Sequence, residues 1–596
     1  MCSIFGYNSP VDFRNIFFEK MRHRGPDCED SIKIENWTLG HQRLSIIDTS
    51  LAGNQPMSKD GNILILNGEI YNYIELKKEF LKGTRFFSDS DTEVLLELLN
   101  RFGLKILNHV NGMFAFAWYN SRENKLILCR DRFGVKPLHW MKINDFIFFS
   151  SEIKPLIQIK PTFEFNENII QSFILDTATD FDVQTFAEDI FQLTPGHFIS
   201  IDQSGSHLDS KWYFGNDFDT VNINDKQELV SYFEFLLTDA IKLRHRSDVP
   251  ICITLSGGLD SSTIYTLAKE RLNSDLQAFT FSHPNAPTDE AKAVMELTAK
   301  YGDKPIIIES DENQSWRELK EALFYLEFPI WNSSAVAYLN TYKAIKSHGF
   351  KVIIEGHGGD EILGGYPYMI EAAWEELLYK CCFLDSFKVL KVFKETLNLS
   401  LNQQYNDDIN IKQYLKKYMY KNLKHTLGNI LLSRPPQIPN GYFQSILEKS
   451  FNFKILPIVL RTFDRLTMSQ SVESRSPFMD YRIVEFSRNI PLKFKVNSLG
   501  SKAILREILK KYGQNDIYKN KVKMGFASDV PKLYNEPKNK LYIEHYLNSF
   551  DFPGHNGLKY SAIAMNSKSD IQWSDVELIW KTIALSMTKE FYKKSN

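Results

Sequence analysis

Short hydrophobic runs bounded by Gly and Asn fill the first part of the chain. Runs at 62–70, 112–120, 124–134 and 144–152 are rich in Ile, Leu and Phe, a pattern typical of β-strands. Between them, residues 90–103 place apolar side chains at helical spacing and end in a glycine, which predicts a helix. Strands interrupted by a few helices predict an α+β layered domain.

From about residue 225 the pattern changes to strands that alternate with helices. Residues 225–246 predict a long helix, and residues 249–272 predict a buried strand, a Gly-containing turn and a helix. Further strands are predicted over 276–281, 304–309 and 351–356, with helices over 289–302 and within 335–348. This alternation predicts a parallel sheet covered by helices on both faces.

A chain of 596 residues is too long to fold around one hydrophobic core. The change of pattern places a domain boundary at 205–225. We therefore predict a first domain over 1–210 and a second over 225–596, of which about 370–596 is mostly helical.

Charge and cysteine content narrow the class of protein. The 71 basic and 73 acidic residues nearly cancel, which argues against a broad nucleic-acid-binding face but allows a local anion site. The six cysteines show neither a disulfide framework nor a zinc spacing. The chain starts without a signal-like segment and contains no long apolar run. We expect a cytoplasmic enzyme with reduced thiols that binds neither nucleic acid nor membrane.

The segment SGGLDSS (256–262) lies between a predicted strand and a predicted helix. Its glycines allow close backbone approach, and a helix start presents free N–H groups to an anion. Its hydroxyls add donors, and its aspartate can hold Mg²⁺. A capped Gly-rich turn would explain the glycines but not the serines and the acid, so we predict phosphate binding. The predicted ligands are Ser256, Gly257, Gly258, Asp260, Ser261 and Ser262.

A second Gly-rich segment, EGHGGDEILGGYPY (355–368), directly follows the strand predicted at 351–356. The carboxyl ends of parallel strands share one edge of a sheet, so this loop is expected beside SGGLDSS. Its acidic residues Asp360 and Glu361 suit a loop that wraps a nucleotide and a metal. A simple turn before a helix is the alternative.

Together the two loops resemble those of the ATP-pyrophosphatase superfamily and, within it, of asparagine synthetases and their relatives. The resemblance implies that ATP is split between its α and β phosphates to activate a carboxylate, with Asp260 and Asp360 holding Mg²⁺. It also implies nucleotide contacts from Thr254, Phe281, Glu355 and Gly356.

The C-terminal part extends this resemblance. Residues 464–486 match the family's C-terminal block, and NKVKMGF (520–526) places Lys523 where a family lysine contacts the ATP phosphates. A solvated surface charge is the alternative for Lys523.

The chain begins MCSIF, so removal of Met1 would leave Cys2 with a free amine that can act as base for its own thiol. Burial as an ordinary early residue is the alternative. Several separated segments resemble the Ntn-type glutaminase domain of glutamine-using asparagine synthetases. They are residues 1–7, 22–27, 39–48, 66–73, 88–94, 111–120 and 130–138.

The resemblance implies the roles of the glutaminase residues. Cys2 would attack the side-chain amide of glutamine, and Asn67 with the Gly68 N–H would stabilise the oxyanion. The α-carboxylate of glutamine would be bound by Arg43. Its α-ammonium would be bound by Glu69 and Asp91. Taken alone, Asn67-Gly68 predicts a type I′ hairpin turn, and Arg43 a salt-bridged surface residue.

The full resemblance implies a fold of two parts. The first is an Ntn-hydrolase-like α+β layered sandwich. The second is an α/β parallel-sheet ATP-pyrophosphatase domain with a helical C-terminal part.

Two stretches depart from the best-known family members. His357 stands where some members carry a glutamate that is thought to deprotonate ammonia, and it either acts as a base or only shapes the loop. Residues 328–339 are closer to a broader branch that includes amidotransferases acting on sugar acids. This segment therefore leaves aspartate and other carboxylates open as the acceptor.

We expect an enzyme that makes asparagine from aspartate, ATP and glutamine. The same chemistry on another carboxylate, such as a uronic acid or a peptide, is the first alternative. A non-catalytic sensor of glutamine or ATP is the second, although Cys2, Asp260 and Asp360 argue against it. A homodimer is a possible assembly.

Overall fold

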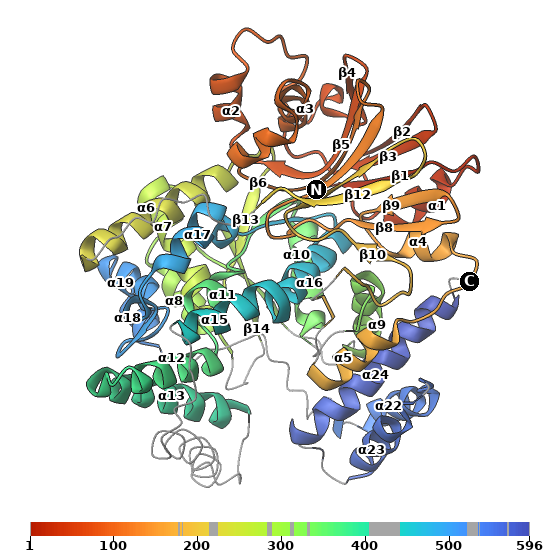
Figure 1. The fold of residues 1–596 in the computed structure, drawn as a ribbon. Helices are drawn as coiled ribbons and strands as arrows, with labels where there is room; N and C mark the ends of the chain where they lie inside the picture. The colour runs from red at the N-terminus through yellow and green to blue at the C-terminus, as the bar shows by residue number, and fades with distance from the viewer. Residues whose placement is uncertain are drawn as a thin grey trace.

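The computed structural model describes residues 2–594 except 177–178, 181–182, 214–224, 283–288, 310–314, 330–333, 405–440, 521–533, 536, 553, 569–570 and 572. The chain forms two units that pack against each other (Figure 1). Antiparallel sheets make the first, and a parallel sheet flanked by helices makes the second. This is the fold class that the sequence predicts.

Two six-stranded sheets form the N-terminal unit, in the orders β10-β8-β9-β1-β3-β2 and β12-β11-β7-β6-β5-β4. The strands are β1 (Ser3–Tyr7), β2 (Cys28–Ile34), β3 (Trp37–Arg43), β4 (Met57–Lys59), β5 (Asn62–Ile70), β6 (Gly112–Asn120), β7 (Lys125–Arg130), β8 (His139–Ile143), β9 (Phe146–Ser150), β10 (Phe191–Gln192), β11 (His197–Ile201) and β12 (His207–Lys211). The helices are α1 (Arg14–Met21), α2 (Tyr73–Phe80), α3 (Asp91–Phe102), α4 (Lys154–Ile159) and α5 (Glu167–Asp176).

Period-two alternation along β5 explains the layers. Ile63 and Ile65 belong to the core between the two sheets, whereas Leu64 and Leu66 belong to the cluster that includes α3. Helix α3 begins after Ser90, whose side chain accepts a hydrogen bond from a backbone N–H of the first turn. The hydrophobic runs of the sequence therefore build a helix-covered sandwich.

The predicted hairpin turn at Asn67-Gly68 is wrong. Strand β5 continues through both residues and pairs them with Ala115 and Phe114 of β6. Gly68 has φ of 145°, and a Cβ there would collide with the backbone carbonyl of Met113. The glycine serves close backbone approach inside a strand.

The second unit contains a five-stranded parallel sheet in the order β15-β14-β13-β16-β17. Its strands are β13 (Ile251–Thr254), β14 (Gln277–Ser282), β15 (Ile306–Glu309), β16 (Val352–Ile354) and β17 (Glu473–Arg475). Because β13 has β14 on one side and β16 on the other, the loops that follow these strands meet at one edge. Strand β17 comes from a region that was predicted to be mostly helical.

Helices surround this sheet, and β18 (Val496–Asn497) pairs with β19 (Gly500–Ser501) beside it. The helices are α6 (Lys226–Arg244), α7 (Leu259–Leu272), α8 (Ala291–Ala299), α9 (Ser315–Leu326), α10 (Ala335–Ser347), α11 (Gly359–Leu363), α12 (Pro367–Tyr379), α13 (Phe383–Gln404), α15 (Tyr442–Lys449), α16 (Leu456–Ser469), α17 (Tyr481–Asn489), α18 (Leu492–Lys495), α19 (Ala503–Lys511), α20 (Asn515–Lys519), α22 (Pro537–Ser549), α23 (Asn556–Asn566) and α24 (Trp573–Lys594). Within the described ranges, no helix is both long and apolar enough to cross a membrane.

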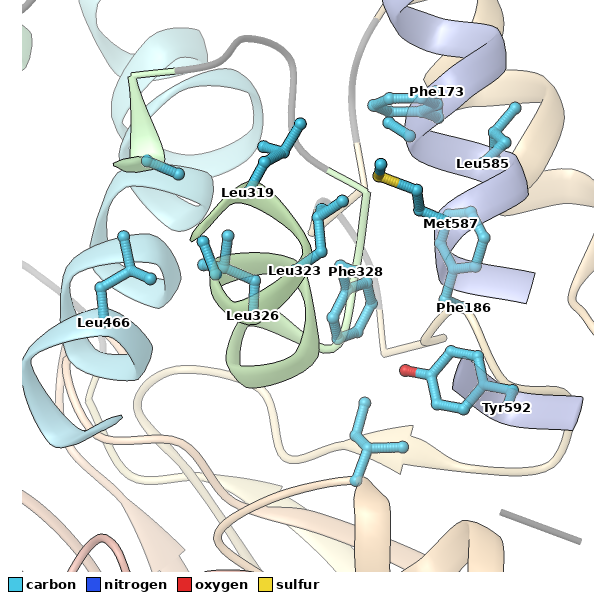
Figure 2. Packing of buried hydrophobic residues seen from close by; sticks show 14 of the residues in the cluster. Phe173, Phe186, Leu319, Leu323, Leu326, Phe328, Leu466, Leu585, Met587 and Tyr592 are labelled. Atoms are coloured by element: carbon cyan, nitrogen blue, oxygen red, sulfur yellow. The ribbon is translucent and has the colours of Figure 1, made fainter. Parts of the chain in front are cut away.

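A hydrophobic cluster joins the two units (Figure 2). Phe173 of α5 and Phe186 belong to the same buried cluster as Leu323 of α9 and Leu585 of α24. The last helix therefore packs against the N-terminal unit as well as against its own. The linker at 214–224 lies outside the described residues, so the boundary proposed at 205–225 stays a prediction.

Candidate active sites

Cys2 lies directly before β1 and is buried. Its backbone N–H donates to Oδ1 of Asn67 at 3.2 Å, and its carbonyl accepts from Nε of Arg24 at 3.2 Å. Burial raises the pKa of the Cys2 thiol, although the nearby cation of Arg43 opposes this shift. A buried thiol with a raised pKa needs a base to become a nucleophile. Met1, whose removal would free that base, lies outside the described residues.

Asn67 is fully buried beside Cys2. Its Nδ2 lies 3.5 Å from Oγ of Ser151, and that oxygen also accepts the N–H of Ile4 at 3.0 Å. The structure thus brings together Cys2, the Asn67 amide and the Gly68 backbone, as the predicted oxyanion site requires.

Arg43 ends β3 and is buried, so the alternative of a surface residue does not hold. Nη1 donates to the Ser50 carbonyl and to Oδ1 of Asn54, each at 2.7 Å. Nη2 donates to the carbonyls of Ile47 and Asp48. Arg43 therefore fixes the loop at 47–54, and its Nε–H, which has no partner among the described residues, can donate to a ligand.

Three buried carboxylates gather near this site. Burial raises the pKa of Glu69, and the charges of Glu473 and Asp91 raise it further. Burial also raises the pKa of Asp91 to about 6, although its carboxylate accepts the Ile70 N–H at 2.7 Å. Arg475 joins the group, with Nη2 at 3.5 Å from Glu69 and Nε at 2.6 Å from Glu473. Such an acidic cluster suits an ammonium group.

Sequence reasoning missed Glu473 and Arg475. Both belong to β17 of the second unit, so side chains from both halves of the chain form the candidate glutamine site. The only signal was that they lie in the segment 464–486, which matches the family block.

The predicted phosphate turn joins β13 to α7. Gly257 has φ of 64°, and Gly258, the N-cap of α7, has no side chain that could cap the first turn of that helix. Oγ of Ser256 accepts the Gly258 N–H at 3.4 Å and lies 3.2 Å from Oγ of Ser261. Ser262 is buried behind them. Uncapped N–H groups of a helix start are suited to an anion.

Asp260 and Asp360 meet at Lys502. Nζ of Lys502 contacts Asp260 and lies 2.6 Å from Oδ1 of Asp360. Burial lowers the pKa of Lys502, but the two carboxylates outweigh it and raise that pKa above its ordinary value. A Cβ on Gly359 or on Gly365 would press on these carboxylates. Sequence reasoning missed Lys502, for which it had no signal.

The two aspartates fit a magnesium site. Both carboxylates reach one ammonium position, and Mg²⁺ prefers one or two carboxylates that are supplemented by phosphate oxygens and water.

Glu355 is the centre of a hydrogen-bond network. Its carboxylate accepts from Thr254 Oγ1 at 3.3 Å, Tyr342 OH at 2.9 Å and Ser474 Oγ at 2.5 Å, and pairs with His357 Nε2 at 3.1 Å. Burial would raise the pKa of Glu355, but these partners, above all His357, hold it below its ordinary value. A ribose contact from Glu355 would have to displace one of them.

Aromatic rings border His357. The imidazole stacks on Phe463 with centroids 3.5 Å apart, and Tyr338 meets Phe463 edge-on at 4.6 Å. Gly356 lies directly against Asp260, so the second loop touches the first, and Phe281 is buried near the end of β14. Lys523 lies outside the described residues.

Helix α16 connects the two sites. Phe463 stacks on His357, while the next residue, Asp464, accepts from Nη1 of Arg24 at 3.0 Å and pairs with Lys136 at 3.5 Å. Burial would raise the pKa of Asp464, but Arg24 and Lys136 hold it below its ordinary value. This buried ion cluster crosses the interface between the units.

Comparisons with known proteins cover nearly the whole chain. A family model described as a glutamine amidotransferase domain matches residues 1–213, and one described as asparagine synthase matches residues 233–570.

Three relatives illustrate the range of proteins that this chain is similar to. The glutamine-hydrolysing asparagine synthetase 1 of Bacillus subtilis (strain 168) is 28% identical over 85% of this chain and 82% of its own. Asparagine synthetase B of Escherichia coli (strain K12) is 31% identical over 62% of this chain and 66% of its own. Amidase chyE of Penicillium rubens is 25% identical over 83% of this chain and 82% of its own.

Proposed function

Because this chain belongs to the asparagine synthase family and carries a glutamine amidotransferase domain, we propose that it converts aspartate to asparagine with nitrogen from glutamine. Its class is that of the glutamine-hydrolysing carbon–nitrogen ligases, which use ATP as co-substrate. The observation that carries the proposal is the pairing of two sites in one molecule. Cys2 lies against Asn67 in one unit, and Asp260 and Asp360 meet beside the phosphate turn in the other.

In the glutaminase site the α-amine of Cys2, freed by loss of Met1, accepts the thiol proton. The thiolate attacks the side-chain amide carbon of glutamine, and Asn67 Nδ2 and the Gly68 N–H stabilise the oxyanion. One such donor is typically worth about 3 to 4 kcal/mol of barrier. Ammonia leaves with the proton, and water then hydrolyses the thioester to glutamate.

The acidic cluster receives the α-ammonium of glutamine, and Arg43 receives its α-carboxylate. Glu69 and Asp91 supply the negative charge, while Arg475 keeps Glu69 in place. Each contact orients the amide carbon toward the Cys2 sulfur.

In the synthetase site the acceptor carboxylate attacks the α-phosphorus of ATP, and pyrophosphate departs to the turn at 256–262. Mg²⁺ held by Asp260 and Asp360 would neutralise the charge of the departing pyrophosphate. Ammonia then attacks the acyl carbon and AMP leaves. His357, held by Glu355, takes the proton that ammonia loses.

An acceptor screen tests the proposal. The enzyme is supplied with ATP, Mg²⁺ and glutamine together with aspartate or candidate uronic acids, and AMP and the amide product are measured. We expect asparagine. No amide from aspartate would contradict the proposal, and amide from a uronic acid would support the alternative. That alternative draws on the relative named as an amidase and on the divergent segment 328–339.

The KM for glutamine is expected to rise as pH falls through about 6. Burial raises the pKa of Asp91 to about 6, so the carboxylate that pairs with the α-ammonium becomes protonated below that pH. Between pH 7 and pH 5 its ionised fraction falls by about tenfold, and kcat/KM for glutamine should fall with it. Initial rates of glutamate release across this range measure the effect. Ammonium-dependent synthesis is the control, and an unchanged pH profile in Asp91→Asn would contradict the assignment.

Replacing Asp464 with alanine is expected to uncouple the two sites. The change removes a buried carboxylate that Arg24 and Lys136 share, although Arg24 keeps Glu152 as a partner, so the free energy of unfolding should fall by about 3 to 5 kcal/mol. Ammonia should then escape at the interface, so less amide forms for each glutamate released. The matched control is Glu75→Ala, since Glu75 is 53% exposed and also reaches across the interface, to Arg246. That pair should contribute under about 1 kcal/mol, and equal losses in both variants would contradict the prediction.

A further inference from the structure

Glu290 is a buried carboxylate that the reaction scheme does not use. It directly precedes α8, beyond the end of β14, and is 5% exposed. Throughout the described part of the chain, no donor or cation contacts its side chain. Its neighbour Asp289 is different, since that carboxylate accepts from Ser282 Oγ at 3.1 Å and from the Ala291 N–H at 3.3 Å. Buried carboxylates are normally paired, and the described residues supply no such partner for Glu290.

The surroundings of Glu290 belong to the synthetase site. Its carbonyl oxygen lies 3.7 Å from the position of a Cβ on Gly257, so it packs against the phosphate turn. Burial raises the pKa of Tyr338, and the charges of Glu355 and then Glu290 raise it further. Tyr338 packs on Phe463, which stacks on His357, the base proposed above. Glu290 therefore lies beside the phosphate turn, and its charge acts on Tyr338, one of the rings next to His357.

The missing partner should be a cation. A phosphate would be repelled by a carboxylate at this position, and the magnesium site is built by Asp260 and Asp360 around Lys502. Burial, with a contribution from Asp289, raises the pKa of Glu290 to about 8, and a bound cation would favour its ionised form. An ammonium group supplies both the charge and the N–H donors.

We propose that Glu290 binds the ammonium group of the acceptor, so that the acceptor is an amino acid rather than a carboxylic acid without an amino group. The proposal rests on the function proposed above and narrows its substrate class. Under it, aspartate is held by its ammonium at Glu290 while its side-chain carboxylate faces ATP. A uronic acid offers only hydroxyl groups and would leave the carboxylate without a counter-charge.

A substrate-by-variant comparison tests this proposal. Aspartate is compared with succinate, which has both carboxylates but no ammonium, on the native enzyme and on Glu290→Gln. Ammonium chloride replaces glutamine, so the glutaminase site plays no part, and pyrophosphate release is measured. We expect the native enzyme to prefer aspartate by about 100-fold or more in kcat/KM. In Glu290→Gln the preference should fall below about tenfold through a raised KM for aspartate, with KM for ATP unchanged.

Control experiments distinguish failure of the role proposed for Glu290 from failure of the proposed function. Glu296→Gln changes an exposed glutamate of the same helix and should behave as native. An unchanged preference in Glu290→Gln, or a raised KM for ATP alone, would overturn the proposal while asparagine formation by the native enzyme stands. If the native enzyme aminates only an acid without an amino group, both proposals fall. If Glu290→Gln does not fold, equal use of aspartate and succinate by the native enzyme would still overturn the role of Glu290.

Discussion

Replacing Cys2 with alanine is expected to abolish glutamine-dependent amide synthesis while ammonium-dependent synthesis continues. The thiol is the only nucleophile in the scheme that attacks glutamine, so its loss should lower glutaminase kcat by roughly 10⁴- to 10⁶-fold. The substitution removes no atom from the synthetase site, so ammonium-dependent synthesis should continue. Parallel assays with glutamine and with ammonium chloride, each followed by amide formation, measure the two effects.

Cys2→Ser is the matched variant, because it keeps the shape of the side chain and replaces only the sulfur. It should lose glutaminase activity as well, with less disturbance of the buried site. Loss of ammonium-dependent synthesis in both variants would contradict the two-site scheme. Mass spectrometry of the native N-terminus adds a second check, since an active glutaminase that retains Met1 would contradict the role of the Cys2 amine.

Local patterns predicted many of the elements well. The run at 62–70 coincides with β5 and the run at 112–120 with β6. Both are predictable because alternate side chains along each strand pack into two different hydrophobic clusters. The helix predicted at 90–103 corresponds to α3, which ends at the expected Gly103. In these cases the information lies within a few residues of the element itself.

Long-range contacts could not be predicted in the same way. Asn67-Gly68 has the composition of a hairpin turn, but the close approach of the Met113 carbonyl from another strand decides its conformation. Lys502 meets Asp260 across 242 residues of sequence, and no local pattern distinguishes it from a surface lysine.

Strand β17 shows most clearly that local sequence patterns do not predict long-range contacts. Its few residues lie in a helical region, and they become a strand because the edge of β16 is available for pairing. Its charged residues Glu473 and Arg475 are then buried against the glutaminase unit.

Asp260→Asn is expected to stop amide synthesis from both nitrogen sources while glutamine hydrolysis survives. The substitution keeps the shape of the side chain but removes one of the two charges that meet at Lys502. A metal ion held by the remaining carboxylate would bind more weakly, and the pyrophosphate charge would be less neutralised. A loss of several kcal/mol of transition-state stabilisation corresponds to a fall in kcat/KM of about 100-fold or more.

Glutaminase activity reports whether the variant is folded, because Glu473 and Arg475 of the second unit complete that site. Glutamate release in Asp260→Asn should stay within about twofold of native if the effect is confined to the synthetase site. Asp275→Asn is the matched control, since Asp275 follows α7 and its side chain is fully exposed. Pyrophosphate release with ammonium chloride, measured across a Mg²⁺ titration, should show a raised Mg²⁺ requirement only in Asp260→Asn. If that variant keeps native pyrophosphate release at low Mg²⁺, Asp260 has no role in holding the metal, and the phosphate turn would have to act through its backbone and hydroxyl groups alone.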